Sequence, residues 1–119
     1  LLTMENESKN KLILAVLQGE DYDDTVYELN RNGFFATLLS STGGFLKKRS
    51  VTLMIGVSAD KADQVLAILK KRAGKRTETI YQSMAPLNGH SAALPAVPVE
   101  REAGGAAIFI LDLESLQKF

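Results

Sequence analysis

Ser41-Thr42-Gly43-Gly44-Phe45-Leu46 is the stretch from which the rest of the chain can be interpreted, because it joins two strand-like runs by a turn with two bulky apolar side chains. Gly43 and Gly44 can adopt positive φ, so backbone N–H groups can converge on an acceptor such as a phosphate. Phe45 offers an aromatic face for a base, and three cations follow at 47–49. The turn suggests a nucleotide site, and an ordinary glycine turn with Phe45 in a local core is the alternative.

Two hydrophobic runs flank this turn. Residues 34–41 are rich in aromatic and aliphatic side chains, which predicts a strand. Residues 50–57 carry their apolar side chains on one parity, which predicts a second strand that returns antiparallel to the first. Gly56 interrupts the other parity, and it either leaves room for a ligand to approach or marks a bulge.

The first segment of the chain predicts a strand and a helix. The almost unbroken apolar run at 11–17 is typical of a strand covered on both faces. A helix should begin near Asp21, where acidic side chains at 21, 23 and 24 would suit the helix dipole, and Gly33 should end it in the left-handed conformation. These carboxylates indicate a helix start and not a metal site.

A second helix is expected from Ser58 or Asp60, both candidate N-caps, to about Ala73, with Gly74 closing it.

From 75 to 104 the hydrophobic periodicity fails and prolines interrupt the chain, which indicates a long loop without a ladder of backbone bonds. Short strands around 79–81 and 97–101 fit within it. His90, the only histidine, lies in this segment and is given a surface role. Residues 106–113 predict a last strand.

The composition narrows the function. A chain of 119 residues suits one domain, which we place at 11–119 after a mobile N-terminal tail at 1–10. Fourteen basic residues balance fourteen acidic ones, so no global field favours nucleic acid or an anionic membrane. The absence of cysteine excludes disulfides and thiolate metal sites. No apolar run approaches the ~20 residues of a membrane helix, so we expect no membrane insertion and a cytoplasmic location.

The order of elements predicts an α+β fold, a ferredoxin-like βαββαβ sandwich. Its two helices can cover only one face of the sheet. Residues 12–17 and 108–111 are nevertheless apolar on both parities. The second face therefore has to be buried by the long loop, by another chain or by both, which favours an oligomer.

Three segments resemble the PII-like cyclic di-AMP receptor family (PstA/DarA) of the nitrogen regulatory PII-like superfamily: residues 32–37, the turn Thr42-Gly43-Gly44-Phe45-Leu46, and Gly104-Gly105-Ala106. The short turn between the second and third strands and the long loop before the last strand also match this family. The resemblance implies a homotrimer that binds cyclic di-AMP in clefts between subunits. It also implies a sensor that relays binding through loop rearrangement to an unknown downstream protein.

The resemblance further implies which residues contact the ligand: Thr37, Thr42, Gly43, Gly44, Phe45, Leu46, Gly56 and Phe109. Four positions depart from the family pattern. Gly33 and Phe35 stand where the family commonly has Asn and Arg, Ser50 ends a turn that commonly continues Arg-Ala-Gly-Asn, and Lys118 replaces a Gln. Each lost polar contact is worth about 1 kcal/mol, so we expect the affinity to fall by one or more decades.

An enzyme would need a nucleophile with its base, an acid–base pair or a metal constellation, and the sequence offers none of these. We therefore expect no catalysis, no metal and no cofactor. Two alternatives to the cyclic di-AMP sensor stay open: a PII-like trimer that docks onto other proteins without any nucleotide, and a sensor of a different adenine nucleotide.

Overall fold

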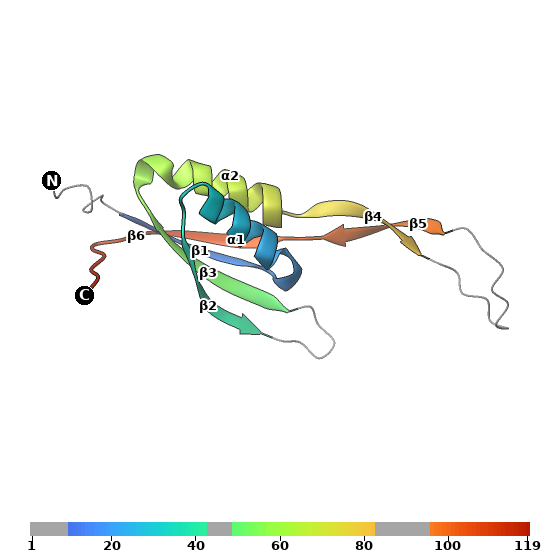
Figure 1. Ribbon diagram of the computed structural model, residues 1–119, viewed down its shortest axis with the longest axis horizontal. Coiled ribbons are helices and arrows are strands. Elements are labelled where there is room, and N and C mark those ends of the chain that lie inside the picture. Colours follow the sequence, from blue (N-terminus) through green and yellow to red (C-terminus); the bar gives the residue numbers. More distant parts are fainter. Residues whose placement is uncertain (1–9, 43–48, 83–95) are drawn as a thin grey trace.

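The computed structural model describes residues 10–42, 49–82 and 96–119, and these form a four-stranded antiparallel sheet, a two-stranded ribbon and a helical layer (Figure 1). The strand order in the larger sheet is β2-β3-β1-β6. Helices α1 and α2 lie together on one face of it (Figure 1). This is the ferredoxin-like βαββαβ arrangement that the sequence predicts.

The elements have the following bounds: β1 Lys11–Gln18, a 3-10 turn Gly19–Asp21, α1 Tyr22–Arg31, β2 Ala36–Thr42, β3 Ser50–Val57, a 3-10 turn Ala59–Lys61, α2 Ala62–Ala73, β4 Arg76–Gln82, β5 Val97–Ala103 and β6 Ala106–Asp112. The last predicted strand of the sequence is thus β6, because β4 and β5 precede it.

The hydrophobic core lies between the helices and the sheet. Buried and half-buried residues alternate along β3 and along β1 from Leu12 onward, as expected when each side chain points to the face opposite its neighbour. The buried side chains of these strands and of the helices include Ile13, Ala15, Leu17, Leu29, Leu53, Ile55, Val65 and Leu69. Packing of this single layer fixes the register of β1 against both β3 and β6.

The opposite face of the sheet, which we call the open face, is apolar and uncovered by any described element. Leu12, Leu14 and Val16 of β1 point to it because they alternate with the buried residues. Phe109 and Leu111 of β6, which pair with Leu14 and Leu12, are both exposed. The described part of the long segment before β6 extends away from the sheet (Figure 1) and leaves this face uncovered.

The expectation of a long loop at 75–104 is wrong for fourteen of its residues. Strands β4 and β5, of seven residues each, pair antiparallel in one uninterrupted register from Arg76↔Ala103 to Gln82↔Val97. The short strands expected inside the loop are therefore longer than the sequence indicated, and they have the backbone ladder that we expected to be missing. A projecting ribbon lacks a buried face, so it shows no hydrophobic alternation. Residues 83–95, including His90, lie outside the described part.

Both helices begin close to the predicted positions, but the predicted side chains do not cap them. Asp21 precedes α1, but its side chain makes no capping hydrogen bond. At the second helix Ser58 and Asp60 bond to one another, which lowers the pKa of the Asp60 carboxyl, and α2 begins only at Ala62. The side chain of Asn10 accepts a hydrogen bond from the backbone N–H of Ala59 at 2.9 Å, so a distant residue supplies the acceptor.

Gly33 ends α1 through its backbone conformation, whereas Gly74 after α2 allows a close backbone contact. Gly33 has φ of 86°, which confirms the predicted left-handed stop of α1. Gly74 has φ of −70°, and a side chain there would place Cβ 2.3 Å from the carbonyl oxygen of Lys70. A Cβ on Gly104 would in turn lie 2.2 Å from the carbonyl oxygen of Gly74. The end of α2 and the turn between β5 and β6 are thus in direct backbone contact.

An ion-pair cluster fixes the base of the ribbon to the body. The Arg76 guanidinium reaches Asp21, which is 4% exposed, at 2.8 Å, and Glu78 at 2.9 Å. Arg101 contacts Glu78 at 3.1 Å and Glu20 at 3.5 Å. The hydrogen bonds that Arg76 donates to Asp21 and Glu78 raise the pKa of Arg76, and the hydrogen bonds that Glu78 accepts from Arg76 and Arg101 lower the pKa of Glu78. Asp21, which directly precedes α1, thus also holds β4.

Removing the Arg76 guanidinium from this cluster should destabilise the protein strongly. Arg76→Leu leaves the buried Asp21 carboxylate without a partner, and we expect the free energy of unfolding to fall by about 3 kcal/mol. The double variant Arg76→Leu/Asp21→Asn should recover most of the loss. The control is Lys75→Gln, which removes an exposed pair with Glu102 at 4.0 Å and should change stability by less than about 0.5 kcal/mol. Urea denaturation measures all three, and equal losses in the two single variants would contradict the assignment.

The same cluster predicts a pH dependence. Because the pKa of Glu78 is lowered in the folded state, its contribution to stability is complete above the pKa of the unfolded chain, about 4.3, and is lost as pH falls through the folded value. Glu78→Gln should therefore melt below the wild type at pH 6, and the difference should be smaller at pH 3. Thermal melts at both pH values test this, and a difference that is undiminished at pH 3 would exclude a contribution from ionisation.

Candidate functional site

Four of the residues expected to bind the ligand are described, namely Thr37, Thr42, Gly56 and Phe109. Thr37, Gly56 and Phe109 lie on the open face. Phe109 of β6 pairs with Leu14 of β1, Leu14 pairs with Met54 of β3, and Met54 pairs with Thr37 of β2. Directly opposed residues of antiparallel strands point to the same face. Thr37 and Phe109 are therefore the two ends of a single row of side chains across the sheet.

These two ends are far apart within one chain. Strands β2 and β6 are the two edges of the sheet, separated by β3 and β1. Three strand spacings correspond to about 14 Å. Gly56 lies one pair further along, opposite Leu12 of β1. Within the described residues, a single chain therefore brings Thr37 and Gly56 near one edge of the sheet and Phe109 to the other.

The row offers contact surface but no charge. The Phe109 side chain is 55% exposed, and Thr37 is exposed as well. Leu14 and Met54 between them are half-buried and apolar. Gly56 has no side chain and thus allows a close approach to the backbone. Such a surface can pack against the flat face of a base and can offer one hydroxyl to its edge, but it cannot neutralise a phosphate.

The glycine turn begins at the same edge as Thr37. Thr42, the last residue of β2, pairs with Ser50, the first residue of β3. The backbone N–H of Gly19 donates to the carbonyl oxygen of Arg49 at 2.7 Å, which ties the end of the turn to the segment after β1. Gly43, Gly44, Phe45 and Leu46 lie outside the described residues, so the structure places only the base of the turn.

The departures from the family pattern have visible consequences. Phe35, which stands where the family commonly has a cation, is 71% exposed just before β2. Gly33 provides the positive φ that ends α1 and carries no polar side chain. Lys118 is exposed in the segment after β6. The edge near Thr37 therefore presents an exposed aromatic ring.

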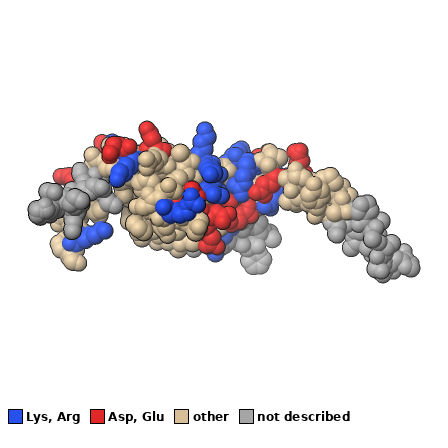
Figure 2. Space-filling model, turned by 45° about the horizontal axis from the view of Figure 1, so that its top comes forward, with Lys and Arg blue, Asp and Glu red and all other residues tan. Residues whose placement is uncertain are grey.

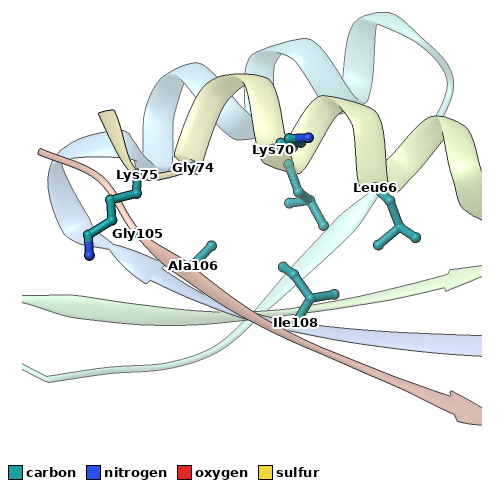
Figure 3. Close-up of a pocket in the computed structure, with 8 residues that line it drawn as sticks. Leu66, Lys70, Gly74, Lys75, Gly105, Ala106 and Ile108 are labelled. Atoms are coloured by element: carbon teal, nitrogen blue, oxygen red, sulfur yellow. The ribbon is translucent and has the colours of Figure 1, made fainter. Parts of the chain in front are cut away.

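A pocket on the other side of β6 was not expected from the sequence (Figure 3). It has a volume of about 390 Å³ and lies between the end of α2 and the start of β6. Leu66 and Ile108 extend into it from the helix and the strand (Figure 3). The remaining lining residues are Leu69, Lys70, Gly74, Lys75, Gly105 and Ala106. Of the signals in the sequence, only the glycines at 74 and 105 mark this close contact.

This pocket does not contain the predicted ligand contacts. Ile108 points to the helix side of β6, whereas Phe109 points to the open face. The polar side chains at the pocket, Lys70 and Lys75, are both exposed. An apolar floor with two ammonium groups at the rim can hold an anion with an apolar body. It lacks the converging buried polar groups that orient a nucleotide.

Charge is concentrated at the base of the ribbon. Figure 2 shows Lys, Arg, Asp and Glu side chains crowded beside the ribbon base, whereas the outer part of the described ribbon is uncharged. Within residues 10–42, 49–82 and 96–119 no group of three or more His, Asp or Glu side chains could hold a metal ion. In the same ranges no helix is long and apolar enough to cross a membrane.

Comparisons with known proteins agree with this architecture. A crystal structure of a functionally unknown protein from Pediococcus pentosaceus ATCC 25745 is similar to this chain, with a TM-score of 0.71 and 30% sequence identity. The similarity covers 93% of this chain and 98% of that chain. A sequence model of the family described as cyclic-di-AMP receptor matches residues 10–119. Because this match spans nearly the whole sequence, the chain belongs to the cyclic-di-AMP receptor family.

Proposed function

We propose that this protein is a cyclic di-AMP sensor whose binding sites form between the subunits of a homotrimer. The observation that supports it is the position of Thr37 and Phe109 at opposite edges of one open face. A subunit that sets its β2 edge beside the β6 edge of a neighbour brings the two residues into one cleft. The sensor acts in the cytoplasm and needs no catalytic group, cofactor or metal.

The open face supports assembly independently of the ligand. Leu14, Phe109 and Leu111 form part of an apolar surface that the described elements leave to solvent. Contiguous apolar surface of this kind marks an interaction site in a soluble protein. Packing of three sheets around a common axis would bury this surface and would place unlike edges next to each other.

Each proposed contact has a physical role. The ring of Phe109 packs against adenine, the hydroxyl of Thr37 bonds to a base edge, and Gly56 gives the base room. Thr42, Gly43, Gly44, Phe45 and Leu46 supply backbone donors and a second aromatic surface in this proposal. The relay to a partner runs through residues 43–48, which connect β2 to β3 in the sequence, and residues 83–95, which connect β4 to β5.

Two alternatives follow from the departures at Gly33 and Phe35. Without the polar groups of the family at these positions, a different adenine nucleotide could be the better ligand, with the exposed Phe35 ring as an additional stacking surface. A trimer that docks onto its partner without any nucleotide is the other alternative. Titration with cyclic di-AMP, ATP, ADP and AMP separates the three.

Binding of cyclic di-AMP should be saturable and should depend on the β6 edge. We expect Phe109→Ala to weaken binding about tenfold, because base–aromatic stacking contributes about 1–3 kcal/mol per base. The control is Tyr27→Ala, an equally exposed aromatic residue on the helix side of the fold. Isothermal calorimetry measures the affinities. No saturable heat with the wild-type protein at high micromolar ligand would overturn the proposal in favour of its alternatives.

A mixing experiment tests whether the site is shared between subunits. Thr37→Asp and Phe109→Asp should each abolish binding, because each places a carboxylate near the ligand phosphates or base. When the two variants are unfolded and refolded together, about a quarter of the sites should combine an intact Thr37 from one subunit with an intact Phe109 from its neighbour. Recovery of binding to about that level is the expected result, and no recovery in mixed trimers would place both residues in a site within one chain.

The trimer itself can be tested at the open face. Leu14→Lys introduces a charge at the centre of this face and should shift the protein to monomers in sedimentation velocity at micromolar concentration. Tyr27→Lys, on the helix side, should leave the trimer intact. A wild-type protein that sediments as a monomer would remove both the buried face and every site between subunits.

A further inference from the structure

The β4–β5 ribbon has two outer edges, and no strand in the described part of the chain pairs with either. Unpaired edges present a row of N–H and C=O groups that can accept another strand, and proteins usually block them. The two edges of this ribbon differ in whether they are blocked. The position of one proline shows which of the two edges is blocked.

Pro98 lies within β5, directly opposite Tyr81 of β4. Proline has no N–H, so within a paired strand it fits where its nitrogen points away from the partner strand. Along each strand of an antiparallel pair, residues whose backbone N–H and C=O groups point away from the partner strand alternate with residues whose groups bond to the partner strand. The register is uninterrupted, so the pairs Thr79↔Glu100 and Thr77↔Glu102 are of the same kind as Tyr81↔Pro98. In all three pairs the backbone N–H and C=O groups point to the outer edges of the ribbon.

The outer edge of β5 is therefore blocked. Three residues of β5 have backbone groups that point to this edge, namely Pro98, Glu100 and Glu102. Pro98 lacks an N–H donor, and the charges of the two glutamates disfavour an approaching strand. The outer edge of β4 presents the backbone groups of Thr77, Thr79 and Tyr81, which are residue types that favour strands. All three are exposed, Tyr81 to 70%. Only this edge has a complete and unobstructed row of donors and acceptors.

The β4 edge is also held in place. Arg76 at the start of β4 is fixed to Asp21 of the body and to Glu78, and Arg101 of β5 joins the same cluster. An incoming strand therefore meets an edge that is already ordered at its base. A two-stranded ribbon is only marginally stable alone, whereas a third strand adds a full ladder of backbone bonds.

The charge on the ribbon indicates the chemistry of the incoming strand. Glu100 and Glu102 point to the same side as Thr79 and Thr77, their partners on β4. Long cationic side chains on an added strand can reach the two carboxylates over the small threonines, across two strand spacings of about 4.8 Å each. Glu100 has no ion pair among the described residues, and Glu102 has only the exposed pair with Lys75 at 4.0 Å.

We propose that the outer edge of β4 is a docking site for an extended, basic segment of a partner protein, which adds a third strand to the ribbon by backbone pairing. Alternate residues of that segment are Lys or Arg and lie beside Thr77 and Thr79. The residues between them are β-branched and lie on the side of Ile80. This site uses neither Thr37 nor Phe109, so it stands or falls independently of nucleotide binding.

The probe is a synthetic peptide, acetyl-Val-Lys-Val-Lys-Val-Lys-Val-amide, added to the isotope-labelled full-length protein. Backbone amide shifts should change at Thr77, Thr79 and Tyr81 and saturate near millimolar peptide. Thr79→Pro removes one outward donor without removing a ladder bond, and it should weaken binding at least tenfold. Thr79→Val keeps the donor and should remain within about twofold of the wild type, and both variants should melt close to the wild type.

Two further arms test charge and backbone pairing. Glu100→Gln should weaken binding several-fold and reduce its salt dependence, and a peptide with Glu in place of Lys should bind at least tenfold more weakly. A peptide N-methylated at alternate residues should lose binding, because its backbone cannot pair. The proposal is overturned if the wild type shows no shifts, if the shifts fall on β5 or the open face, or if Thr79→Pro binds as well as Thr79→Val.

Discussion

Backbone pairing of β1 with both β3 and β6 is the constraint on which the rest of the structure depends. β1 lies inside the sheet, and its side chains are apolar on both parities. Ile13, Ala15 and Leu17 require the helical layer on one side. Leu12, Leu14 and Val16 then form the centre of an apolar surface on the other side, which α1 and α2 cannot cover. One strand thus determines where the core lies and which face is left for another molecule.

The ribbon depends on β1 in a less direct way. β1 leads into the turn that carries Asp21, and the carboxylate of Asp21 receives Arg76 at the start of β4. Breaking a buried pair on one side leaves an uncompensated charge, which is the reason such a pair restricts geometry even where its net contribution to stability is small. The backbone of Gly105 donates to Ala73 at 2.8 Å and secures β6 to the end of α2 beside the same ribbon base.

Much of this fold could be predicted from the sequence, since the elements packed on the core carry a periodic pattern. The strand predicted at 50–57 coincides with β3, and the run at 106–113 contains β6. β4 and β5 were underestimated because the ribbon is in contact with the body only at its base and has polar residues on both sides. The ion pair of Asp21 with Arg76 was not predicted because its partner lies 55 residues away in the sequence, whereas the local sequence indicated only the start of a helix.

The candidate site shows a similar division. Sequence and resemblance together place Thr37, Gly56 and Phe109 on strands. The alternation of side chains along each strand then puts them on the same face of the sheet. Their separation to opposite edges follows from the strand order β2-β3-β1-β6, which the pattern of a single sequence does not contain. The pocket beneath α2 was missed for the same reason, because its lining comes from two elements that meet only after folding.

This geometry links assembly, ligand and ribbon in the function that we propose. If each site takes Thr37 from one subunit and Phe109 from the next, the ligand binds only the assembled protein and therefore stabilises the assembly. Phe109 lies four residues after Gly105, which is bonded to the end of α2, and Gly104 contacts Gly74 two residues before Arg76. A displacement of β6 by a bound base would thus act directly on the anchored start of β4. Interior packing is too dense to absorb such a shift, so the ribbon is the element through which a ligand at the open face can alter what a partner protein meets.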